Sequence, residues 1–272
     1  MSSRGTDKPK LSMPRLRPVL VLVAALLSQY PLAAQEYFEG FDTAGKPRDG
    51  HGIVWDYRAE LSPVREWTEL IPGDGYAYLT AEREFLKRRA RPYSFWPFQT
   101  LSFGPIGAGH RISMRAKNTA IHGLAAMIFT YREQDAIDEI DLEITASDTE
   151  SRRPHHRTGP DGGWTDLRMA TWIGADKHKP EPTTLVKQPA RDAEGGPLSL
   201  QDDKFRIYTI EWDKQEVRFF IDGVRQHIIE DKVPDRPARA IFGLRQMPWA
   251  GRADWTEPQT MTIDWVSVEP LP

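Results

Sequence analysis

The chain has no cysteine among its 272 residues. This absence excludes disulfides, cysteine nucleophiles, thiolate zinc sites and iron–sulfur clusters, so stability must come from apolar burial and from hydrogen bonding within sheets. An excess of basic charge is also lacking, because 36 Lys and Arg residues stand against 39 Asp and Glu residues. We therefore expect neither nucleic acid nor an anionic membrane as a partner.

The apolar run at 18–27 is too short for a transmembrane helix, which needs roughly 20 apolar residues. Basic residues precede this run and the small residues of 32–34 follow it, which is the order typical of a secretory signal peptide. We therefore predict a signal peptide at 1–34, a mature domain at 35–272, and a secreted or periplasmic protein that has no membrane contact after cleavage. An uncleaved N-terminal anchor and a chance apolar stretch are the alternatives.

Helical periodicity is scarce as well. The chain instead shows short runs rich in β-branched and aromatic residues, separated by Gly, Pro, Asp and Asn. Such runs indicate strands, and the sequence Ile-Asp-Gly-Val at 221–224 indicates a hairpin turn. We predict an all-β, antiparallel sandwich with strands near 76–80, 111–115, 124–131, 139–145, 205–212, 216–221, 240–244 and 260–269.

Two polar stretches, 147–163 and 177–196, are predicted to be long loops, which in compact domains tend to be functional or disordered. The first contains His155 and His156. No further metal ligands at a suitable spacing accompany them, so we interpret the pair as part of a solvated loop.

The segment 139–143 reads Glu-Ile-Asp-Leu-Glu. Side chains alternate between the two faces of a strand, so Glu139, Asp141 and Glu143 should share one face while the two apolar residues between them point into the core. The alternative without a catalytic role is an exposed edge strand on which water screens the three charges. The apolar flanks and the apolar run 124–131 favour an interior strand, where crowding raises the pKa of at least one carboxyl.

A protonated and an ionised carboxyl side by side are what the cleavage of a glycosidic bond requires. One carboxyl protonates the leaving oxygen and the other attacks the anomeric carbon. Positions four residues apart on a flat strand are roughly 13 Å apart at Cα, so the side chains must lean toward each other. Taken alone, this acidic alternation has low specificity in a chain with 39 acids.

The same segment resembles the signature strand of glycoside hydrolase family 16, which holds lichenases, laminarinases, related endoglycanases and transglycosylases. The resemblance extends over nearly all of 36–269, and the joint order of the segments is far more specific than any one of them. The segments that carry it are 38–42 with Trp55, 111–117, 123–131, 205–212, 220–223, 248–251, 254–255 and 261–266. It implies a jelly-roll sandwich with a substrate cleft on its concave sheet.

The resemblance also implies residue roles. Glu139 would be the nucleophile, Glu143 the general acid and then the general base, and Asp141 the assisting carboxylate. Trp249 and Trp255 match cleft aromatics that stack on glucosyl rings. Trp172 could line the cleft or pack in the core, whereas Trp212 and Trp265 alternate with apolar partners and are assigned to the core.

Some residues depart from the lichenase pattern. Met247 stands where lichenases carry Asn, and their polar strand near Trp172 is here 169–171, Met-Ala-Thr, so the glycan linkage stays open. Catalysis requires no cofactor. The resemblance further implies a structural Ca²⁺ held by Glu39 and Asp264, whose oxygen ligands suit calcium. An ordinary polar pair is the alternative for these two acids.

These features predict a monomeric, retaining endo-glycosidase that acts on a polysaccharide, with β-glucan as the first candidate. A transglycosylase of the same family is one alternative, and a non-catalytic, lectin-like carbohydrate-binding protein is another. A structural envelope protein that binds no oligosaccharide is a third. The fold alone does not choose among them.

Overall fold

The structure is a computed structural model. It describes residues 37–272 except for 50–52, 61–64, 83–97, 119–122, 134–135, 147–164, 177, 179, 201 and 252–254. The predicted signal peptide, His155 and His156 therefore lie outside the described residues. In the described part of the chain, no helix is both long and apolar enough to cross a bilayer.

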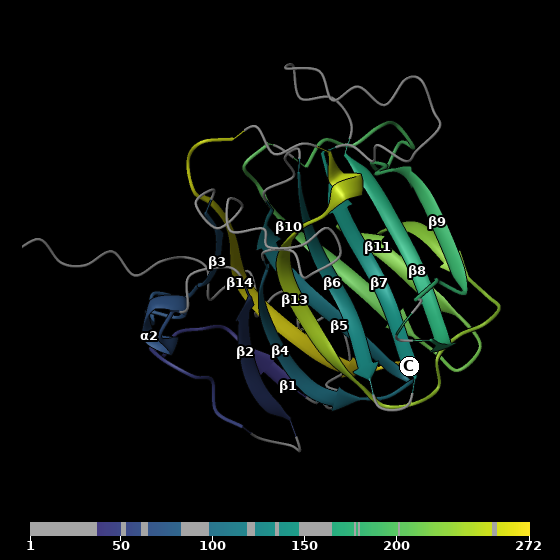
Figure 1. The fold of residues 1–272 in the computed structure, drawn as a ribbon, viewed down its shortest axis with the longest axis horizontal. Helices are drawn as coiled ribbons and strands as arrows, with labels where there is room; N and C mark the ends of the chain where they lie inside the picture. The colour runs from purple at the N-terminus through teal and green to yellow at the C-terminus, as the bar shows by residue number, and fades with distance from the viewer. Residues whose placement is uncertain are drawn as a thin grey trace, which may run out of the picture. The chain divides into compact units, whose positions relative to one another are not determined.

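Two seven-stranded antiparallel sheets make up the fold (Figure 1). Sheet I has the order β1-β14-β5-β10-β11-β12, with β3 also paired to β14. Its strands are β1 Tyr37–Glu39, β3 Ala77–Ala81, β5 His110–Lys117, β10 Phe205–Trp212, β11 Val217–Ile221, β12 Val224–Ile229 and β14 Gln259–Pro270. This sheet contains five of the eight predicted strands, each within two residues of its predicted bounds.

Sheet II has the order β2-β4-β13-β6-β7-β8-β9. Its strands are β2 Val54–Glu60, β4 Phe98–Ile106, β6 Leu124–Glu133, β7 Ile137–Thr145, β8 Asp166–Ala175, β9 Thr184–Pro189 and β13 Ala238–Gln246. The remaining three predicted strands are β6, β7 and β13. Within the described ranges, two single turns of helix, α2 Trp67–Leu70 and η1 Pro248–Ala250, complete the elements.

One apolar core draws residues from both sheets, as a β-sandwich requires. From β7 it takes Ile140, Leu142 and Ile144, each no more than 1% exposed. From sheet I it takes Trp212, which is fully buried and whose Nε1 donates a 2.8 Å hydrogen bond to the carbonyl oxygen of Pro234. The predictions of an all-β sandwich, of an interior strand at 139–145 and of a core position for Trp212 are confirmed.

The loop predicted at 177–196 is wrong in part, because β9 pairs with β8 inside it. β9 is the edge strand of sheet II, and its sequence Thr-Leu-Val-Lys-Gln-Pro ends in proline. Lysine and proline are tolerated at sheet edges, where no further strand needs the proline's missing N–H. The polar composition of the segment therefore marks an edge rather than a loop.

The core position predicted for Trp265 is also wrong. The register of β14 against β5 shifts between Ile263 and Trp265, which breaks the alternation on which that prediction rested. Trp265 is partly exposed, and its ring lies 6.0 Å from that of Phe38.

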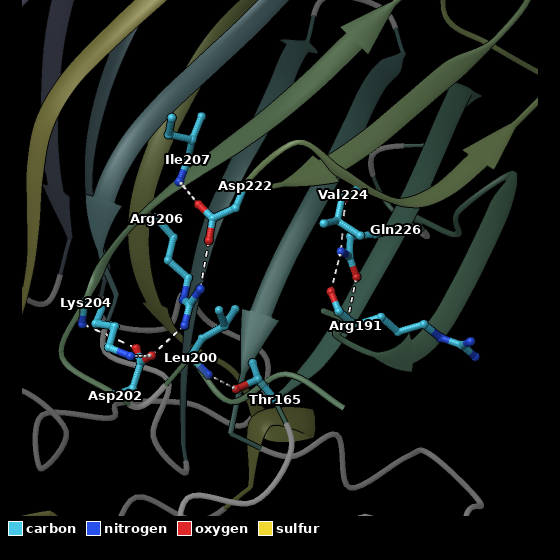
Figure 2. Close-up of polar contacts among 10 residues, drawn as sticks. All are labelled: Thr165, Arg191, Leu200, Asp202, Lys204, Arg206, Ile207, Asp222, Val224 and Gln226. Carbon is cyan, nitrogen blue, oxygen red and sulfur yellow. Dashed lines mark hydrogen bonds and ion pairs between the residues drawn. The ribbon is translucent and has the colours of Figure 1, made fainter. Parts of the chain in front are cut away.

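The predicted hairpin turn joins β11 and β12, and Asp222 and Gly223 both have positive φ, 50° and 78°. This conformation suits the Asp-Gly pair of a tight hairpin. Figure 2 shows that the Asp222 carboxylate also accepts hydrogen bonds from the backbone N–H of Ile207 and from Arg206, each at 2.8 Å. These two hydrogen bonds hold the turn against β10.

Candidate active site

β7 carries the three acids of the signature on one face. Its burial alternates, with Ile140 and Leu142 fully buried in the core and Glu139 and Glu143 partly exposed. The strand pairs with β6 on one side and β8 on the other without a shift of register from Glu139 to Thr145. We call the side of sheet II on which Glu139, Asp141 and Glu143 stand the acid-bearing face.

The register identifies the neighbours of each acid on this face. Glu139 lies between Tyr131 and Trp172, Asp141 between Phe129 and Ala170, and Glu143 between Met127 and Arg168. Opposed residues of antiparallel strands have Cβ atoms about 4.5–5.5 Å apart, so these side chains are in contact range. The acids therefore stand among aromatic and aliphatic side chains, together with one arginine.

Asp141 is held at the centre of the group. It is 5% exposed, and its Oδ2 accepts a 2.6 Å hydrogen bond from Nε1 of Trp172. A further hydrogen bond joins its carboxyl group to that of Glu139. Because two carboxylates have no proton to share, this second bond requires one of the two groups to be protonated.

The directions of the two pKa shifts favour Asp141 as the protonated partner. Burial raises the pKa of Asp141 well above its ordinary value, and the negative charge of Glu139 raises it further. Burial also raises the pKa of Glu139, to about 7, although the hydrogen bond from Asp141 opposes the rise. Burial and the charge of Glu139 thus both favour the neutral form of Asp141, which can then donate its proton in the hydrogen bond to Glu139.

Glu143 stands two positions further along the same face and is partly exposed. Its charge acts on Glu139 and adds to the rise of the Glu139 pKa. The structure thus brings together all three acids that the sequence singled out, two of them hydrogen-bonded and the third within electrostatic range. Such a group can supply a carboxylate nucleophile and a separate proton donor to one bond.

The three tryptophans predicted to bind sugar differ in their surroundings. Trp172 stands on the acid-bearing face beside Glu139 and is partly exposed. Trp249 is 7% exposed, packs against Ala125 and Met127, and has the guanidinium of Arg168 3.8 Å above its ring. Its ring is therefore not an open stacking surface, and its role in sugar binding stays a prediction.

Trp255 is 9% exposed and packs against Ala81 and Leu124. Its predicted role in sugar binding likewise stays a prediction.

The residues that depart from the lichenase pattern differ in their surroundings. Of the three residues 169–171, only Ala170 faces the acids, because Met169 and Thr171 are fully buried on the other face. Met247 is partly buried and packs against the cluster that contains Trp249. The change from a polar to an apolar side chain therefore concerns mainly Met247 and Ala170.

Sequence reasoning missed the arginines of this face, among them Arg168 on β8 and both Arg239 and Arg245 on β13. Arg245 lies opposite Ala125, and Ala125 lies opposite Thr145 of β7. Alternation within each strand shows which residues of that strand share a face with one another. Only the register between strands shows that these arginines share a face with the acids. No local signal could have selected them.

The predicted calcium ligands are engaged with other groups. Asp264 forms an ion pair with Arg115, and Oε1 of Glu39 accepts a 2.7 Å hydrogen bond from the backbone N–H of Phe41. A cation at Asp264 would have to displace the guanidinium, so this arrangement does not fit calcium well. No cluster of three or more His, Asp or Glu side chains suited to a metal occurs among the described residues. The calcium site stays a prediction.

Comparison with known proteins yields one family. The sequence profile described as "Glycosyl hydrolases family 16" matches residues 101–267, which contain all three acids. A beta-glucanase of Brevibacillus brevis is 23% identical over 250 residues, which cover 86% of this chain and 82% of that protein.

Solved structures share the fold. A beta-1,3-1,4-glucanase (lichenase) derived from a mouse hindgut metagenome aligns with a TM-score of 0.59 at 18% identity, covering 86% of this chain and 99% of that one. A structure described as the apo Crh5 transglycosylase aligns with a TM-score of 0.55 at 19% identity, covering 89% of this chain and 86% of that one. The profile match extends over more than half of the sequence, and the chain belongs to glycosyl hydrolases family 16.

Proposed function

We propose that this protein is a retaining endo-β-glucanase, which cleaves internal bonds of a β-linked glucan by double displacement. One observation carries the proposal: Glu139, Asp141 and Glu143 share one face of β7, and the buried Asp141 between them is held by a hydrogen bond from Trp172. The names of relatives support the substrate class, since three of them are called beta-glucanases. The acid-bearing face of sheet II would hold the polysaccharide.

In the first step, an oxygen of Glu139 attacks the anomeric carbon of the sugar. The bond from that carbon to the glycosidic oxygen breaks, and the electron pair goes to the oxygen, which takes a proton from Glu143. The leaving chain departs with a free hydroxyl, and the remaining chain is esterified to Glu139. Asp141 stays neutral and keeps its hydrogen bond to Trp172, which fixes the carboxyl beside the nucleophile.

In the second step, Glu143 is a carboxylate and takes a proton from water. The water oxygen attacks the anomeric carbon, the ester bond breaks, and the electron pair returns to Glu139. Two inversions leave the β-configuration unchanged. The ester link forms and breaks at a carboxylate that Asp141 stabilises by donating a hydrogen bond.

Azide provides a sharp test of the two roles. Glu139→Ala opens the nucleophile's position, so azide should enter there and convert an aryl β-gluco-oligosaccharide into the α-glycosyl azide. Glu143→Ala keeps the nucleophile but lacks the general base, so azide should resolve the ester and give the β-glycosyl azide. The opposite pairing of variant and product would exchange the two roles, and an α-configured first product from the unmodified protein would exclude retention.

A screen of the purified protein against lichenan, laminarin, xyloglucan, agarose and carrageenan would identify the glycan. Sizing of the products separates the two enzymatic alternatives, because hydrolysis yields only chains shorter than the substrate whereas transglycosylation also yields longer ones. Binding without any change in chain length would leave the lectin-like alternative.

A further inference from the structure

The pairing of β8 with β7 is irregular at one place beside the acids. Trp172 is opposite Glu139, but in the next step along β8 the register shifts by one residue. Ile173 and Gly174 therefore both stand against the single residue Asp138, which is the two-versus-one count of a β-bulge. Gly174 has a φ of 60°, a conformation that glycine adopts without steric cost. The bulge begins directly after Trp172, so its shape determines how that residue leaves the strand.

Both residues of the bulge donate their backbone N–H groups to side-chain oxygens. The N–H of Ile173 donates a 2.9 Å hydrogen bond to Oγ1 of Thr183. The N–H of Gly174 donates a 2.9 Å hydrogen bond to Oδ1 of Asp138, whose side chain is only 1% exposed. A hydrogen bond to a carboxylate is about twice as strong as one to a neutral oxygen. Asp138 is therefore the principal attachment of the bulge to β7.

Asp138 is itself held by two cations. Its Oδ2 forms an ion pair with Nε of Arg236, just before β13, and lies 3.7 Å from Nη1 of Arg132, its opposite residue on β6. A buried carboxylate is stable when it is paired in this way. Asp138 directly precedes Glu139 on β7, so its side chain projects from the other face of the strand and does not reach the acid-bearing face. It can affect the acids only through β8.

Trp172 connects the bulge with the acids. Its Nε1 donates a 2.6 Å hydrogen bond to Oδ2 of Asp141, although its opposite residue is Glu139. A bulge bends its strand and changes the direction of the side chains beside it. The contacts therefore form a continuous series, from Asp138 through the bulge and the indole to Asp141.

We propose that Asp138 is a positioning residue: it holds the bulge of β8 in the shape that directs the indole of Trp172 toward Asp141. The direction of the Asp141 carboxyl beside Glu139 then depends on a side chain from the other face of the sheet. The inference rests on the proposed function, because this direction affects the reaction only if Glu139 is the nucleophile.

The test removes the bond between Asp138 and Gly174 in two ways. Asp138→Leu deletes the acceptor at a similar side-chain volume, but two guanidinium groups lose this partner. The triple variant Asp138→Leu, Arg132→Met, Arg236→Met deletes the acceptor and both charges together. Exchange of a buried ionic group for apolar side chains of similar volume is often neutral for stability. The triple variant therefore also serves if Asp138→Leu alone does not fold.

Two quantities are measured for each variant. The Nε1–H resonance of Trp172 in ¹H–¹⁵N spectra, assigned by its absence in Trp172→Phe, reports the bond to Asp141 without any substrate. Steady-state kinetics on a β-gluco-oligosaccharide gives kcat and KM separately. Thr165→Val is the control, because it removes another buried bond directly before β8, the 2.9 Å hydrogen bond from the N–H of Leu200 to Oγ1 of Thr165.

Both Asp138 variants should shift the indole proton of Trp172 upfield, as the loss of a hydrogen bond requires. They should lower kcat about tenfold through misplacement of the carboxyl, with KM nearly unchanged because Asp138 does not reach the glycan. Thr165→Val should lower stability in urea but move neither quantity.

Three results would overturn the inference. One is an unmoved Trp172 resonance in the Asp138 variants. Another is a shift in Asp138→Leu that the triple variant reverses, because the two unpaired charges and not the lost bond would then have moved the indole. The third is a shift of the resonance with an unchanged kcat, since the direction of the indole would then be without effect on the reaction.

The NMR measurement separates this inference from the proposed function. If no glycan is cleaved but the resonance of Trp172 moves in the Asp138 variants, the bulge directs the indole and the catalytic proposal fails. If glycan is cleaved and the resonance stays in place, the proposed function stands and the role of Asp138 fails.

Discussion

Nε1 of Trp172 lies 2.6 Å from Oδ2 of Asp141, although Trp172 is opposite Glu139 in the sheet register. The indole therefore reaches diagonally along β7 and binds the middle acid. It occupies Oδ2 of Asp141, while the carboxyl of Asp141 also bonds to Glu139. This one contact gives Asp141 a fixed direction.

The first prediction concerns the proton of Asp141. Asp141→Asn keeps an N–H donor for Glu139 and an oxygen for Trp172, so kcat/KM at pH 7 should fall only about tenfold. Asp141→Ala removes both contacts and should cost about 10²- to 10³-fold, because Glu139 loses the bond that favours its ionised form. Steady-state kinetics across pH 5–9 measures both effects. Equal inactivation of the two variants would mean that the proton of Asp141 itself moves during the reaction.

The second prediction separates the catalytic from the structural effect of the indole bond. Trp172→Phe removes the donor to Asp141, and Trp212→Phe removes the comparable buried bond to Pro234. Each variant should lose about 1–3 kcal/mol of stability in urea unfolding, since each leaves an acceptor unsatisfied. Only Trp172→Phe should also lower kcat, by about tenfold. A similar loss of kcat in both variants would contradict the role of Trp172.

The third prediction follows from the pKa of Glu139, which is raised from 4.5 to about 7. Below pH 4.5 Glu139 is protonated in both the folded and the unfolded chain, so its titration does not change the free energy of unfolding. Between pH 4.5 and 7 the carboxyl ionises in the unfolded chain first, so stability falls as the pH rises. Glu139→Gln removes this loss. It should therefore stabilise the protein increasingly from pH 5 to pH 8, by about 3 kcal/mol at the upper end.

Thermal unfolding at pH 5 and pH 8 measures this gain, with the exposed Glu257→Gln as the control for the chemical change alone. A gain that is the same at both pH values would show that Glu139 titrates as an ordinary glutamate.

The fourth prediction concerns the space above Gly243. A Cβ added there would lie 2.8 Å from Cγ2 of Thr100 and 3.1 Å from the carbonyl oxygen of Gln99, and the latter is backbone that cannot turn away. Gly243→Ala should therefore destabilise the fold by about 1–3 kcal/mol through overpacking. Gly107→Ala is the matched control, because its new Cβ would meet only Cγ of Pro237 at 3.9 Å. Urea unfolding that ranks the two variants in the other order would refute the steric argument.

Much of the fold follows from local pattern. Alternation from Glu139 to Thr145 determined which side chains are buried, because successive residues of a strand face opposite sides whatever lies beside them. The Asp-Gly pair at 222–223 determined a tight turn for an equally local reason, because both residues tolerate the positive φ that such a turn requires. The position of three acids on one strand face therefore followed from the sequence alone.

The tertiary structure decided what surrounds these acids. Register between strands is set by contacts between residues far apart in the chain, so only the assembled sheet places Trp172 and Arg168 beside the signature and Arg245 on the same face two strands away. The same holds for Trp249, which lies beneath Arg168 although its motif suggested an open ring. The proton held by Asp141 depends on burial and on neighbouring charge, and these are properties of the packed molecule, not of the sequence Glu-Ile-Asp-Leu-Glu.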